Sequence, residues 1–128
     1  MSILSSNSFI MLEKSLGYLW TKQAAIADNV ANAETPGYKE KVVTFEESLK
    51  SKLVQASRQS APVKSMRQVL EGTPFSVTEQ LVQTRMDDNG VNVTAQAAEA
   101  IRNAYQMRYV MSSINSELAI LNSAIRGQ

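Results

Sequence analysis

Hydrophobic residues near the start of the chain recur at alternating steps of three and four, the spacing of one helix face in a coiled coil. The series runs through Phe9, Leu12, Leu16, Leu19, Gln23, Ile26 and Val30, and Gln23 is its one polar member. The pattern predicts a helix from Ser8 to Ala33, with an N-cap among the side chains of residues 5–8. Thr35-Pro36-Gly37 should end this helix, because proline disfavours the helical conformation of the preceding residue and glycine accepts a positive φ.

A second stripe with the same spacing occupies the C-terminal part of the chain. After Ala97 it continues through Ala100, Ala104, Met107, Met111, Ile114, Leu118, Leu121 and Ile125. It predicts a helix from Thr94 to Ile125, capped by Thr94 and about 48 Å long at the usual rise per residue. Asn89-Gly90, just before it, is a strong turn signal.

Two long stripes at opposite ends of one chain predict that the helices pair as an antiparallel coiled coil. The expected fold is mainly α and forms one domain in three parts. These are an N-terminal helix and corner (1–37), an irregular insert (38–92) and a C-terminal helix (93–128). Both helices carry further apolar residues away from their stripes, among them Ile10, Met11, Ile101, Tyr105 and Tyr109. These extra faces must be covered by the insert or by other subunits.

The insert has weaker patterns. Val42, Val43 and Phe45 favour a short strand, and the spacing of Phe45, Leu49, Leu53 and Ala56 favours a short helix. The stretch from Ser57 to Pro74 is polar and is interrupted by proline and glycine, so we expect no long element there. Alternating apolar residues between Phe75 and Met86 favour short strands.

The amino-acid composition excludes several classes of function. The 128 residues include no cysteine and no histidine, and the net charge is +1. Disulfides, cysteine or histidine metal sites and histidine-based catalysis are therefore excluded, and nothing favours nucleic acid as a partner. We expect a protein that is not an enzyme and that needs no cofactor or small-molecule substrate. A calcium loop around Asp87-Asp88-Asn89-Gly90 fails because Arg85 and Gln96 would occupy its first and twelfth positions.

We expect neither a membrane-spanning helix nor a cleaved signal peptide from this sequence. No run of about 18 apolar residues is present, so no membrane-spanning helix is expected. Ala31-Asn32-Ala33 mimics a signal-cleavage site, but no basic segment precedes it and charged residues interrupt the apolar stretch. Any export should therefore proceed without a cleaved signal peptide.

The most distinctive segment is the corner after the first helix. Its asparagines, Asn29 and Asn32, lie near the helix end, where amides can bind free carbonyls or another chain. The run Asp28 to Lys39, followed by Phe45, resembles the NIANAxTPGYK…F signature of flagellar rod, hook and related axial proteins. The residues that match this signature are Asn29, Ala31, Asn32, Thr35, Pro36, Gly37, Tyr38 and Phe45.

The other end of the chain narrows this resemblance. The segment Asn89-Gly90-Val91-Asn92-Val93 resembles the turn before the last helix of a short proximal rod protein, and the length of this chain is similar to that of such a protein. The order of residues in the turn differs from the family pattern, so a sister proximal rod protein is an alternative. A second alternative is a small helical adaptor that binds partner helices.

The resemblance implies a structural subunit of the flagellar basal body. It implies type III export, helical assembly into the periplasmic rod and transmission of torque. The implied partners are FliE, FlgC and further rod proteins, the MS ring and the export gate. The two stripes would then be the subunit interfaces, with polar residues such as Gln23, Asn29 and Asn32 fixing the register.

Overall fold

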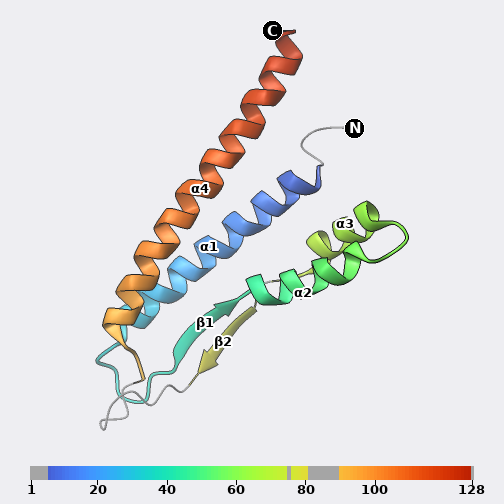
Figure 1. Cartoon of the computed structure of the whole chain (residues 1–128). Helices are drawn as coiled ribbons and strands as arrows, with labels where there is room; N and C mark the ends of the chain where they lie inside the picture. The colour runs from blue at the N-terminus through green and yellow to red at the C-terminus, as the bar shows by residue number, and fades with distance from the viewer. Residues whose placement is uncertain (1–5, 75, 81–89, 128) are drawn as a thin grey trace.

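The computed structural model describes residues 6–74, 76–80 and 90–127, which contain four helices and two strands (Figure 1). In chain order these are α1 (Asn7–Ala31), β1 (Glu40–Thr44), α2 (Glu46–Ser57), α3 (Pro62–Gly72), β2 (Ser76–Gln80) and α4 (Val93–Arg126). The mainly helical fold with a small sheet in its middle agrees with the prediction from the sequence.

The two terminal helices lie side by side and run in opposite directions (Figure 1). The predicted antiparallel pairing is thus confirmed. α1 has 25 residues and α4 has 34, so they are about 38 Å and 51 Å long. Because of this difference, the C-terminal turns of α4 project past the start of α1 (Figure 1).

Side chains at the helix starts define where the two long helices begin. The Ser6 hydroxyl accepts a hydrogen bond from the Phe9 N–H at 3.1 Å, which places the α1 cap within the expected segment. Asn92, and not the expected Thr94, caps α4, since its Oδ1 accepts from the Ala95 N–H at 3.1 Å. After α1, Gly37 has a φ of +70°, the left-handed conformation that the corner was expected to need.

The insert forms an antiparallel strand pair, with the two helices α2 and α3 between its strands in sequence. β1 and β2 pair antiparallel with Val43 opposite Val77, and α2 follows β1 as its spacing predicted. The expectation of no long element between Ser57 and Pro74 was wrong, because α3 occupies most of it. Pro62 stands in the first turn of α3, where its missing N–H costs nothing. The expected strand at 82–86 and the turn at Asn89 lie outside the described residues.

The core is built between α1 and the insert. The rings of Tyr18 and Phe45 lie 5.3 Å apart, and Leu49 of α2 and Leu70 of α3 are buried in the same cluster. Val110 of α4 joins this cluster from the other side. α1 therefore contacts α4 on one side and the insert on another, which fixes both relative to it.

Candidate functional site

The N-terminal stripe is mostly covered within the chain. Leu19 and Ile26 are buried, and Phe9, Leu12, Leu16 and Gln23 are half-buried. Val30 is the exception, with 43% of its surface exposed at the end of α1. Most of this stripe is therefore covered within the single chain, and Val30 is left exposed.

The C-terminal stripe is divided between two faces of α4. Ala100, Met107, Ile114 and Leu121 are half-buried, whereas Ala104, Met111, Leu118 and Ile125 are exposed, as is Ala97 before them. The residues one position before four of these exposed residues are covered instead. They are Gln96, Asn103, Val110 and Glu117, which are buried or half-buried. The covered face of α4 is thus rotated by about one residue from the hydrophobic stripe.

The exposed surface of α4 carries many apolar side chains. Besides half of the predicted stripe, α4 exposes Ile101, Tyr105, Tyr109 and Ile120. Tyr109 and Ile125 expose 74% and 75% of their surface, on different sides of the helix. Apolar side chains that are exposed along most of a long helix are typical of interaction surfaces.

Asn29 joins three elements at the other end of α1. Its carboxamide is 1% exposed and donates from Nδ2 to the Lys41 carbonyl at 2.9 Å and to Gln96 Oε1 at 3.2 Å. Its Oδ1 accepts from the Lys41 N–H at 2.8 Å and from the Tyr38 hydroxyl at 3.4 Å. All four hydrogen-bonding positions of the amide are therefore occupied, and α1, β1 and α4 are held in one arrangement.

The bonds to Lys41 have a further structural role. Both backbone groups of Lys41 bond to Asn29, so they lie at the edge of β1 that does not pair with β2. The Asn29 amide binds this N–H and C=O as a neighbouring strand would. Farther along the same edge, the Tyr18 hydroxyl donates to the Val43 carbonyl at 3.5 Å. α1 thereby covers an edge that would otherwise be open to pairing with other chains.

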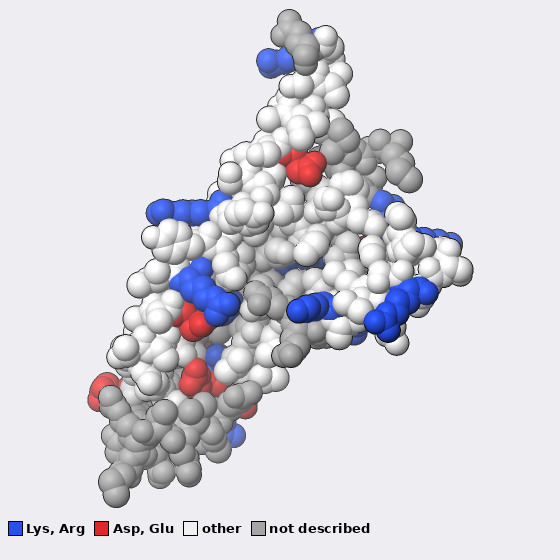
Figure 2. Space-filling model, viewed as in Figure 1, with Lys and Arg blue, Asp and Glu red and all other residues white. Residues whose placement is uncertain are grey.

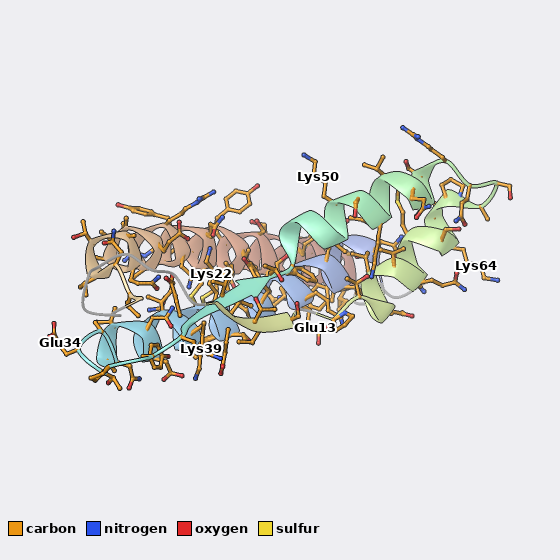
Figure 3. The ribbon with its side chains drawn as sticks, turned by 90° about the horizontal axis from the view of Figure 1, so that it is seen from below. Glu13, Lys22, Glu34, Lys39, Lys50 and Lys64 are labelled. Carbon is orange, nitrogen blue, oxygen red and sulfur yellow. The ribbon has the colours of Figure 1, made fainter. Side chains whose placement is uncertain are left out.

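A second set of polar contacts crosses the α1–α4 interface. Asn103, 0% exposed, donates from Nδ2 to the Leu19 carbonyl at 3.1 Å and to Gln23 Oε1 at 2.9 Å. Lys22 forms a salt bridge to Glu99 at 2.9 Å where the two helices lie side by side (Figure 3). Buried amides in an apolar seam penalise any other alignment, because a shifted helix would leave them without partners.

The remaining motif residues form the corner. Asn32 Nδ2 donates to the Asp28 carbonyl at 2.8 Å, and the Thr35 hydroxyl donates to Asn32 Oδ1 at 3.3 Å. Ala31, Pro36 and Gly37 are exposed, Tyr38 is half-buried, and Phe45 is buried in the core. The motif is thus divided between an internal contact at Asn29 and an exposed turn.

Sequence reasoning identified Asn29 and Gln23 but not their partners. Gln96 and Asn103 were not singled out, because both are polar and lie off the hydrophobic stripe. The signal that was present is their spacing of seven residues, which places both on one helix face.

Two carboxylates at the α1–α4 interface have opposite pKa shifts. Partial burial raises the pKa of Glu40 above its ordinary 4.5, although the Gln96 amide donates a hydrogen bond to it. The Lys22 ammonium lowers the pKa of Glu99 below 4.5. Glu40 therefore contributes stability below pH 4.5 that is lost as pH rises through its folded pKa. Glu99 contributes stability above pH 4.5 that is lost as pH falls.

These signs give a paired prediction. Relative to the unsubstituted chain, Glu40→Gln should become more stable as pH rises from 4 to 7, because glutamine keeps an acceptor but never ionises. Glu99→Gln should become relatively less stable over the same range, because it loses the charge that pairs with Lys22. Urea unfolding at several pH values measures both differences. Parallel pH profiles for the two variants would contradict the assignment.

A groove of about 640 Å³ lies beside this interface. Its floor includes Tyr18 and Leu19, one wall is formed by Leu49, Leu53 and Val54 of α2, and the other by Tyr105, Tyr109 and Val110 of α4. Among the described residues that line it, Lys50 alone is charged. The space-filling view shows a hollow between α4 and the α2–α3 hairpin (Figure 2). Its lining suits apolar side chains of a helix better than a polar substrate.

The described residues hold no group of three or more acidic residues that could bind a metal ion. None of the described helices has the length and hydrophobicity needed to cross a membrane.

Comparison with known proteins gives two matches. The sequence model of the flagella basal body rod protein family matches residues 20–39, which include the corner motif from Asn29 to Tyr38. Over its whole length the chain is 24% identical to the flagellar basal body rod protein FlgB of Aeromonas hydrophila, and the alignment covers 99% of that protein. The first match lies on the segment that builds the Asn29 contact, and the second extends over both long helices.

Proposed function

We propose, from the premise that this chain is a flagellar basal body rod protein, that it is the proximal rod subunit FlgB. The premise is supported by the family match at the corner and by the full-length similarity. A structural role in the rod follows from it. The proposal adds the place in the rod and the manner of assembly.

The observation that carries the proposal is the set of exposed apolar side chains along α4. A monomer held by Asn29, Asn103 and the Lys22–Glu99 salt bridge still exposes Tyr105, Tyr109 and Ile125 along one helix. Exposed apolar side chains do not stabilise an isolated chain, but they suit many repeated contacts between subunits in a filament. The rigid α1–α4 pair would transmit torque because its polar contacts resist sliding of one helix along the other.

The finer parts of the proposal follow the resemblance described above. The chain would leave the cell interior through the type III apparatus without signal cleavage and would assemble in the periplasm. FliE, FlgC and further rod proteins would be its neighbours, close to the MS ring and the export gate. The sister protein FlgC is the alternative identity, and the full-length relative favours FlgB.

Complementation tests this function. A tagged copy should restore motility to cells that lack the gene, and it should copurify with basal bodies after detergent extraction and high-salt washing. Recovery of the tagged chain only as a defined small oligomer, with basal bodies intact without it, would contradict the rod role. That result would instead support a helical adaptor that binds partner helices through the groove.

A further inference from the structure

We propose that the projecting C-terminal turns of α4 in one copy of this chain occupy the apolar groove between α1, α2 and α4 of the next copy. This inference rests on the proposed function and deepens it, because it names both halves of one contact in the assembly.

The projecting segment lacks a partner among the described residues. Asn103 contacts Leu19 and Gln23, and Glu99 contacts Lys22, so residue numbers on the two helices run in opposite directions. Continuing this register at a helical rise, Asn7 lies opposite roughly residue 117 of α4. Beyond that point Leu118, Ile120 and Ile125 are exposed. The face that packs on α1 thus continues into an apolar segment with no α1 beside it.

The groove is the matching surface in the same chain. Its walls are apolar and include the exposed residues Val54, Tyr105 and Tyr109. Gln106 in its lining has a buried Oε1 without a hydrogen-bond partner among the described residues. Asn103 Oδ1, in the α1–α4 interface beside it, likewise has no partner in the part of the chain that the structure describes. The projecting segment carries Asn122 and Ser123, which offer donors.

Charge is compatible with this pairing. Of the groove-lining residues that the structure describes, Lys50 is the charged one, and it extends from α2 into open space (Figure 3). Glu117 is the acidic residue at the start of the projecting segment. The C-terminal end of α4 carries the negative end of its helix dipole, which Arg126 in the last turn partly offsets.

The groove cannot be filled by the same chain's own segment. Tyr109 and Ile125 belong to one continuous helix and are separated by 16 positions, which is roughly 24 Å along its axis. Two different patches of one surface, held apart in this way, make a head-to-tail contact that adds further copies without closing a pair. Such a contact builds an open filament when the rotation between successive copies does not close a ring, and an open filament is what the proposed function needs.

The absence of cysteine from the chain permits a direct test. Tyr109→Cys and Ile125→Cys each replace a strongly exposed side chain, so circular dichroism should show unchanged helicity. The two single variants are mixed at high concentration and oxidised gently, and each is also oxidised alone. Ser60→Cys, exposed between α2 and α3, replaces Tyr109→Cys as the matched control. A chain with both substitutions is examined in basal bodies.

The inference predicts a mixed disulfide between Cys at 109 and Cys at 125, well above the Ser60 control, and a ladder of linked chains for the double variant. Dimers from Tyr109→Cys alone would overturn it in favour of a symmetric pair. If the double variant enters basal bodies and supports motility without forming the ladder, the head-to-tail contact is wrong while the rod function stands. No mixed disulfide in either setting overturns it as well.

Discussion

Replacing Asn29 with alanine should lower the free energy of unfolding by roughly 2–4 kcal/mol, the largest stability effect we expect from a single polar residue. The substitution leaves the Lys41 N–H and C=O without the amide that binds both, and Gln96 Oε1 also loses its donor. Each buried group without a partner costs about 1–3 kcal/mol, partly relieved by entering water. Urea denaturation followed by circular dichroism measures the loss.

Asn32→Ala is the matched control for Asn29→Ala. It removes an asparagine three residues away whose bonds, to the Asp28 carbonyl and the Thr35 hydroxyl, are exposed. We expect it to cost less than about 1 kcal/mol, as surface substitutions usually do. Equal losses for the two variants would mean that Asn29 does not hold α1, β1 and α4 together.

Replacing Leu118 with aspartate should abolish incorporation into basal bodies and with it motility, while the monomer keeps its helicity. Leu118 lies on the projecting part of α4 and is already exposed, so the charge adds little strain to the single chain. At a packed contact between subunits the same carboxylate would be buried without a partner, which is far more costly. Motility assays and immunoblots of basal bodies and of exported protein separate assembly from export.

The control for Leu118→Asp is Ser60→Asp, which adds the same charge to the exposed turn between α2 and α3, away from α4. We expect this variant to support motility. If Ser60→Asp is equally defective, the added charge and not the loss of the apolar side chain at position 118 would explain the result. Normal motility of Leu118→Asp would refute the proposed role of the projecting segment.

The sequence was sufficient to predict the two long helices and their pairing, because their hydrophobic period continues over many turns. It misplaced the covered face of α4, because Gln96 and Asn103 are polar and a hydrophobic pattern counts polar residues as exposed. Their burial depends on partners in α1 that are about 70 to 80 positions away, and local spacing carries no signal of these. Half of the apolar stripe is therefore exposed in the single chain and not packed on α1 as the pairing of the two stripes had suggested.

The insert shows a different limit. α3 was missed because its segment is largely polar and Pro62 was taken to interrupt it, yet proline in the first helical turn is favourable. The signal that was present is the helical spacing of Val63, Met66, Val69 and Leu70. Leu70 is buried against residues of α1 and α2, and Val69 packs beside it.

Electron cryomicroscopy of basal bodies purified from cells that express this chain tests the central claim most directly. The account predicts density in the proximal rod that fits the antiparallel α1–α4 pair, with the Asn29 corner turned toward the insert and the Tyr109 face of α4 against a neighbouring copy. A rod that lacks this chain, or one in which its two long helices are separated and contact different neighbours, would contradict the account.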